Sequence, residues 1–539
     1  MKKLFVCLVI LSMIICCVPA MAFANSESDT VKSVSKSKEA TNLDEQFTSQ
    51  ITLSLPSAEE QLVTDVVFVL DKSTSTDIEN EALNMLENLK EQANQTGAKI
   101  KVGVVIFNKI ANETLSLTEL NDANMSSIES AIKEEISSGT NLHAGILAGK
   151  EMLDNDQSVD ANRKYMIVVS DGITYMFNEE PTSVAWSWTA DSVQNWAGPD
   201  NWYGKYGSND APTDWNQYLS NIGAQIEKDG NQYDYPYGDT PEVSTPAEEY
   251  TEHANSIDKA LYLSYQAYQE AAAAGYNCYA MTADTGTEYA WGPSFMTYLG
   301  GGTDVSFNDI QNDIAYAVST GSYVIDTMGN DELDGKAYNF DFINELDKID
   351  VSVGGTKLDK EKVADNHYGF GKTASGYRFE VIYYPEGTEN SNGEECIKWL
   401  INEDISNFSR VQLIYSVQLI NPQTEEGTYG QYDKNGSQGF DGLYTNNSAV
   451  LYPVDSDGVA GEAQVFNKPT VSYVVEKTDV TEPNSPADSE EEQMPDDSSD
   501  VTSDTPKTED SSTMTAALII MAASAGIFAA LLRKRKTSV

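Results

Sequence analysis

Five oxygen-bearing side chains in the first half of the chain are of the types that bind a small, hard cation. The apolar run "VVFVL" ends in Asp71, and Ser73 and Ser75 follow it at alternate positions. The segment "SSGTNLHAGI" supplies Thr140, and a second apolar run, "YMIVVS", ends in Asp171. Mg²⁺ prefers about six oxygen ligands, of which only one or two are carboxylates and several are waters. These residues therefore predict a divalent cation site, with Mg²⁺ as the expected ion and Mn²⁺ or Ca²⁺ as alternatives.

The same residues also have a purely structural interpretation. Asp and Ser at strand ends commonly cap the following helix, which is expected here to begin near Thr76. His143, three residues after Thr140, either supports the cation site or simply packs at a helix start. If an ion does bind, hydroxyl ligands do not cancel its charge, so it would accept a carboxylate from a binding partner. That arrangement suits a binding site.

The elements that must position these residues alternate along the chain. Between about residues 64 and 319, Val- and Ile-rich runs alternate with amphipathic helical segments. This pattern predicts an α/β fold, a doubly wound, Rossmann-like parallel sheet covered by helices on both faces. Such sheets bind ligands at the carboxyl ends of their strands, where Asp71 and Asp171 are expected. We place this domain at residues 61–323.

The order D-x-S-x-S, then Gly-Thr, then a strand ending in Asp-Gly resembles the von Willebrand factor type A (VWA) domain and its metal-ion-dependent adhesion site. The resemblance covers roughly residues 64–319, and all five metal positions are present. It implies a divalent metal on the five residues named above and an adhesive function, with no enzymatic activity.

An aromatic-rich segment, about residues 173–250, follows Asp171. A loop of this length inside a compact domain is usually functional, and aromatic side chains are favoured at binding hot spots. The rings are expected either to bind a ligand beside the cation or to form a small core for the insertion. The segment holds five of the seven tryptophans, Trp186, Trp188, Trp196, Trp202 and Trp215.

Residues 324–476 have a different character, with short alternating strands separated by Gly, Asn and Pro. This pattern is typical of an antiparallel β-sandwich. Residues 46–60 contain one more strand, which we expect to join this later domain, so that the α/β domain is an insertion. The alternative is a hairpin or edge strand on the α/β domain. Cys278 and Cys396 are expected to be separate thiols.

The stretch "YTNNSAVLYP" resembles the late strand of Gram-positive pilin and adhesin sandwich domains, some of which form a Lys–Asn isopeptide bond. Asn446 or Asn447 would be the acceptor, and the sequence singles out no lysine. The alternative is a plain strand with an Asn-rich turn.

Both chain ends carry targeting signals. Residues 1–24 combine two lysines, an apolar run and Ala-Phe-Ala, as in a secretory signal peptide. Residues 25–45 are expected to be a disordered arm and residues 477–512 an acidic, Ser- and Pro-rich stalk. Residues 513–532 are predicted to be a transmembrane helix, followed by a basic cytoplasmic tail at 533–539.

The segment "TPKTED" just before this helix resembles the cell-wall sorting signal of Gram-positive surface proteins. That signal is Leu-Pro-x-Thr-Gly, so Pro506 and Thr508 match, whereas Thr505 and Glu509 depart from it. A sortase would cleave after Thr508. The alternative is a plain membrane anchor.

The formal net charge of −50, from 84 acidic and 34 basic residues, argues against a nucleic-acid partner, because phosphates would be repelled. We expect a cell-surface adhesin whose protein or glycan ligand supplies a carboxylate to the metal, with a sortase or pilus subunits as further partners. The alternative is a structural component of a surface or pilus complex. A metal-dependent hydrolase is a remote third hypothesis, because the chain has three histidines and no nucleophile elbow or zinc helix.

Overall fold

The computed structural model describes most of residues 33–477, all within the first of two units, residues 1–477 and 478–539. The predicted signal peptide, transmembrane helix, basic tail and Thr508 lie outside the described residues. In the part that is described, no helix is long and apolar enough to cross a membrane. The described ranges are 33–72, 78–136, 139–182, 187–188, 193–194, 210–231, 234, 254–283, 289–302, 304–388 and 393–477.

The α/β domain is built on a five-stranded sheet with strand order β5-β4-β3-β6-β9. Strands β4, β3, β6 and β9 are parallel, whereas β5 is antiparallel to β4. The expectation of a wholly parallel sheet is thus wrong at this edge. A short turn joins β4 to β5, and so tight a connection allows only antiparallel pairing. The strands are β3 (Val63–Asp71), β4 (Lys99–Phe107), β5 (Ala111–Glu119), β6 (Lys164–Ser170) and β9 (Asn277–Thr282).

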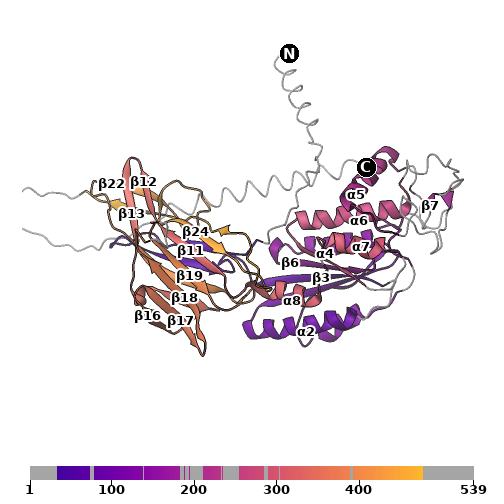
Figure 1. Cartoon of the computed structure of the whole chain (residues 1–539), viewed down its shortest axis with the longest axis horizontal. Coiled ribbons are helices and arrows are strands. Elements are labelled where there is room, and N and C mark those ends of the chain that lie inside the picture. The colour runs from indigo at the N-terminus through magenta and orange to yellow at the C-terminus, as the bar shows by residue number, and fades with distance from the viewer. Residues whose placement is uncertain are drawn as a thin grey trace, which may run out of the picture. The chain divides into compact units, whose positions relative to one another are not determined.

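Helices cover both faces of this sheet, as Figure 1 shows, with α2 and α8 on one side and α4, α6 and α7 on the other. A hydrophobic core lies on each face of the sheet, and alternate residues of β3 belong to one or the other. Val67 and Val69 pack toward α4 and α6, and Phe68 and Leu70 pack toward α2 and α8. Burial on both faces explains why β3 is an uninterrupted apolar run. The helices are α2 (Ile78–Thr96), α3 (Met125–Ile132), α4 (Leu142–Asn155), α5 (Trp215–Asp229), α6 (Ser256–Ala273), α7 (Trp291–Leu299) and α8 (Phe307–Ala315).

The β domain contains two larger sheets that share one hydrophobic core. One sheet has the order β1-β2-β21-β13-β12, with β14 and β15 attached, and the other has the order β16-β17-β18-β19-β11-β24-β25. The first contains β1 (Ser37–Ala40), β2 (Thr48–Leu55), β12 (Asn330–Leu333), β13 (Lys336–Phe342), β14 (Asp350–Val353), β15 (Thr356–Lys357) and β21 (Val411–Leu419). The second contains β11 (Tyr323–Met328), β16 (Lys360–Ala364), β17 (His367–Thr373), β18 (Gly376–Tyr384), β19 (Cys396–Ile401), β24 (Asn446–Tyr452) and β25 (Gln464–Val465). A third, small sheet is formed by β22 (Gly427–Asp433), β23 (Leu443–Tyr444) and β26 (Thr470–Val475).

Strand β2 pairs with β21 along its full length, from Thr48 opposite Gln418 to Leu55 opposite Val411. The chain therefore enters the β domain, leaves it to form the α/β domain, and returns at β11. The predicted disordered arm is wrong for Ser37–Ala40, which form β1 against β2. A polar segment is ordered here because the edge of β2 supplies hydrogen bonds to its backbone.

A buried ion pair lies where the two domains join. Arg163 Nε, in the short helix η1 (Ala161–Arg163), is 3.1 Å from Glu60 Oε2. The same guanidinium donates to the Asn407 carbonyl oxygen at 3.0 Å. Nearby, β10 (Tyr316–Val318) pairs with β20 (Ile405–Ser406). Contacts between the domains thus supplement the two chain connections.

The glycine directly after Asp171 is required by both its backbone angle and its surroundings. Gly172 has φ +75°, and a Cβ atom there would lie 2.1 Å from the Gly292 carbonyl oxygen. Gly301 has a similar φ of +84° but open space around it. We expect Gly172→Ala to lower the free energy of unfolding by about 1–3 kcal/mol more than Gly301→Ala, the usual cost of overpacking. Urea denaturation measures both, and equal losses would contradict the close approach.

Candidate cation site

Two carboxylates meet at the carboxyl edge of the α/β sheet. Asp71 is the last residue of β3, and Asp171 directly follows β6, the parallel strand beside it, in which Val169 lies opposite Leu70. Both aspartates are buried, with 6% and 5% of their surface exposed. The Ser170 hydroxyl donates to Asp71 Oδ2 at 2.6 Å and accepts from the Gly172 backbone N–H at 3.0 Å. The parallel register thus brings together the two acidic residues that the sequence places 100 positions apart.

Thr140 lies next to the segment that follows Asp171. Its carbonyl oxygen accepts from the backbone N–H groups of Tyr175 and Met176, at 3.4 and 3.2 Å. Thr140 is 5% exposed and comes just before α4, whose N-cap is Asn141. Three of the five predicted ligands, Asp71, Thr140 and Asp171, therefore lie on adjoining segments. Ser73 and Ser75 lie outside the described residues.

Burying the two ionised carboxylates close together is electrostatically unfavourable without a cation. Burial and, to a lesser extent, the negative charge of Asp71 together raise the pKa of Asp171 to about 7, although the Ile173 N–H, which donates to Asp171 Oδ1 at 2.9 Å, opposes the shift. A divalent cation would relieve both the burial of charge and the repulsion. This donor set of two carboxylates with a hydroxyl nearby suits a hard cation.

A metal site made of acidic, cysteine and histidine side chains alone is not present among the described residues. No group of three or more such side chains there could hold an ion. The predicted site differs in kind, because it combines two carboxylates with hydroxyls.

His143 has a packing role in α4. It is buried, and its Nδ1 accepts the backbone N–H of Asn178 at 3.0 Å. Burial lowers its pKa to about 4, so the ring is neutral near neutral pH. The contact fixes the chain that follows Asp171, where Asn178 adopts φ +67°.

Comparison with known families identifies this part of the chain. Residues 65–194 match the family model of the von Willebrand factor type A domain. The chain contains a VWA domain. The matched range includes all five predicted metal positions and begins two residues into β3.

Matches among solved structures include three pilus proteins. The pilus adhesin SpaC from Lactobacillus rhamnosus GG is 14% identical with a TM-score of 0.29, and the similarity covers 81% of this chain and 47% of that one. The type V pili tip protein Mfa5 from Porphyromonas gingivalis is 15% identical, with a TM-score of 0.28 and shares of 81% and 77%. The tip pilin GBS104 from Streptococcus agalactiae is 13% identical, with a TM-score of 0.24 and shares of 82% and 92%. This chain thus spans about half the length of SpaC. No curated protein matches the chain.

Trp215 is part of the hydrophobic core of the VWA domain, which was one of the two roles expected for the tryptophans, and its ligand-binding role stays a prediction. It begins α5, is 8% exposed, and donates from Nε1 to Ser294 Oγ at 3.0 Å. Its ring centroid lies 5.2 Å from that of Phe295. The aromatic insertion thus contains a packed helix. Trp188 belongs to a two-residue strand, β7 (Ser187–Trp188), paired with β8 (Val193–Gln194). Trp186, Trp196 and Trp202 lie outside the described residues.

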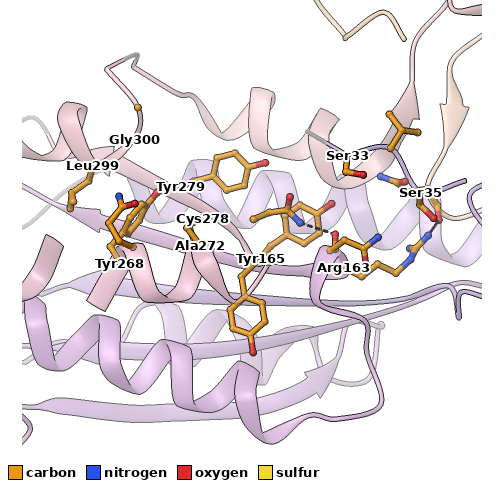
Figure 2. A pocket seen from close by; sticks show the side chains of 18 of the residues that line it. Ser33, Ser35, Arg163, Tyr165, Tyr268, Ala272, Cys278, Tyr279, Leu299 and Gly300 are labelled. Atoms are coloured by element: carbon orange, nitrogen blue, oxygen red, sulfur yellow. Dashed lines mark hydrogen bonds between the residues drawn. The ribbon is translucent and has the colours of Figure 1, made fainter. Parts of the chain in front are cut away.

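A tyrosine-lined pocket of about 750 Å³ lies along the edge strand β9, and Figure 2 shows its labelled tyrosines, Tyr165, Tyr268 and Tyr279. The residues that line it do not include the three described metal-site residues. The sequence alone did not predict this pocket. A partial signal was present in "YQAY", where Tyr265 and Tyr268, which both line the pocket, are three residues apart on one helix face.

The pKa of Asp171 predicts a pH dependence for the metal-free protein. The Asp171 carboxyl is harder to ionise in the folded protein than in the unfolded chain. Between pH 3.8, its ordinary pKa, and about pH 7, the folded state therefore holds more protons than the unfolded state. In EDTA, stability should therefore fall as pH rises through this window, by at most about 4 kcal/mol at about 1.4 kcal/mol per pKa unit. Urea denaturation in EDTA at several pH values measures this. Asp71→Asn should reduce this loss of stability with rising pH. An unchanged loss would show that Asp71 does not contribute to the raised pKa of Asp171.

Trp215 provides a separate test of core packing. Because its ring is buried among aromatic neighbours, Trp215→Ala should lower the free energy of unfolding by about 3–5 kcal/mol. Trp215→Phe keeps most of the packing and should cost much less. A Trp215→Ala protein that is as stable as the wild type would contradict the core assignment.

Proposed function

We propose that this protein is a cell-surface adhesin whose VWA domain binds a protein or glycan ligand through a divalent cation, with Mg²⁺ as the expected ion. Asp71, Thr140 and Asp171 would hold the ion together with Ser73 and Ser75. The observation that supports this most directly is the pair of buried, mutually repelling carboxylates at the carboxyl edge of the sheet, with Thr140 on the adjoining segment. No catalytic role is proposed for these residues.

The charge of the chain explains why an ion would control binding. A ligand that carries a carboxylate would be repelled by a protein with a net charge of −50. A divalent cation held by these oxygens would keep waters in its coordination shell, and that carboxylate could replace one of them. Adhesion should then depend on the ion itself. Export through residues 1–24 and anchoring through residues 513–532, with or without cleavage after Thr508, remain part of this proposal.

A second candidate is a structural role in a surface or pilus complex. The tyrosine-lined pocket beside edge strand β9 favours it, because partly exposed tyrosines such as Tyr298 are common at protein interfaces. Such a contact would not need the cation. The two candidates therefore differ in their response to EDTA.

The test is ligand capture by folded variants. We expect Asp71→Ala and Thr140→Ala to abolish capture in a screen of immobilised matrix proteins and glycans in Mg²⁺ or Mn²⁺, and EDTA to abolish capture by the wild type. Asp365→Ala is the matched control, because this aspartate is 98% exposed and lies in the β domain. It should bind as the wild type does.

Circular dichroism and urea denaturation of each variant establish that the domain is folded. Undiminished, EDTA-resistant capture by folded Asp71→Ala would contradict the cation-dependent adhesin and favour the structural role.

A further inference from the structure

Four polar side chains from four strands form a closed cluster in the core of the β domain. Lys38 Nζ, from β1, lies 2.7 and 2.9 Å from the two carboxylate oxygens of Asp326, in β11. Asn446 Nδ2, in β24, donates to Asp326 Oδ1 at 2.8 Å. The Tyr415 hydroxyl, in β21, donates to Asp326 Oδ2 at 2.5 Å. Lys38 Nζ and Asn446 Nδ2 therefore contact the same carboxylate oxygen.

This cluster is shielded from water and surrounded by apolar residues. Lys38 and Asp326 are 1% and 0% exposed, and Asn446 is 2% exposed. Asp326 lies between Ile397 and Ala449 on the two neighbouring strands, both of which belong to the hydrophobic core. A buried ion pair is at best a weak source of stability, because desolvation offsets its attraction. Stability alone therefore gives little reason for these charges to be here.

Burial shifts both proton equilibria toward the uncharged forms. It lowers the pKa of Lys38, although attraction to Asp326 opposes the shift. It raises the pKa of Asp326, although Lys38, Tyr415 and Asn446 oppose that shift. The uncharged pair, a neutral lysine beside a protonated carboxyl, is thus more populated here than it would be in water. An uncharged amine is the nucleophilic form of lysine.

The strand geometry selects one of two adjacent asparagines. The pairing of β11 with β24 shifts register at this point, from Thr327 opposite Ser448 to Met328 opposite Asn446. Asn446 lies in the core, whereas Asn447 is half-buried and accepts the backbone N–H of Asn330. In addition, the Thr445 hydroxyl donates to Asn446 Oδ1 at 2.7 Å.

We propose that Lys38 and Asn446 join through an intramolecular isopeptide bond and that Asp326 transfers the protons. Neutral Nζ of Lys38 attacks Cγ of Asn446, and the carbonyl electron pair moves to Oδ1, where the Thr445 hydroxyl stabilises the charge. Protonated Asp326 gives its proton to Nδ2 and takes one from the attacking nitrogen. The Cγ–Nδ2 bond breaks, ammonia leaves, and an amide remains. The reaction needs no oxidant or other reagent.

The bond would join the two large sheets of the β domain. Lys38 belongs to the sheet of β2 and β21, and Asn446 to the sheet of β11 and β24. The VWA domain is inserted between β2 and β11. Its connection through β2 therefore leads to the N-terminal part of the chain, and its connection through β11 leads to the C-terminal part. The crosslink would give the connection through β2 a covalent path to β24 and hence to the C-terminal part of the chain. This consequence does not depend on the cation site.

Mass spectrometry of the purified full-length protein tests the bond directly. After protease digestion, the wild type should give one branched peptide that contains Lys38 and Asn446, with a mass lower by one ammonia than the two peptides together. Recovery of the Lys38 and Asn446 peptides only as separate species of full mass would overturn the proposal and leave an ion pair.

Variants assign the roles of the residues. Lys38→Arg, Asp326→Asn and Asn446→Ala should each abolish the branched peptide, whereas the matched control Asn447→Ala should retain it. Loss of the branched peptide in folded Asn447→Ala, or its persistence in Asp326→Asn, would contradict the assignment. The wild-type digest decides the existence of the bond even if a core variant fails to fold.

Discussion

The parallel register of β3 and β6 is the constraint on which the proposed site depends. It fixes the ends of two apolar strands at the same edge, so Asp71 and Asp171 are held close together and out of water. Around this pair, the Thr140 carbonyl is tied to the segment beyond Asp171, and the close approach of Gly172 to Gly292 leaves no room for a side chain. The local structure thus maintains an unfavourable pair of like charges that a cation would stabilise.

The two domains handle buried charge in opposite ways. In the VWA domain, two carboxylates repel each other, and their partner is expected to come from solution. In the β domain, the charge of Asp326 is balanced within the chain by Lys38, Tyr415 and Asn446. The first arrangement is suited to reversible binding, and the second to permanent strengthening of the fold.

The sequence predicted the parts of the fold that local patterns determine. Continuous apolar runs indicated β3 and β6, and their last residues indicated Asp71 and Asp171, because strand ends in such sheets share one edge. Lys38 could not be predicted, since it lies in a polar segment and its partner Asp326 is 288 positions away. The burial of Trp215 depends likewise on residues of α7. Such features arise from long-range packing, which no local periodicity encodes.

We propose that a divalent cation binds between Asp71, Thr140 and Asp171 of the VWA domain. A crystal structure of the protein grown with Mn²⁺, with data collected near the manganese absorption edge, tests this most directly. We expect one strong anomalous peak in contact with oxygens of these residues. A map with no peak there, at a Mn²⁺ concentration that supports adhesion, would contradict it.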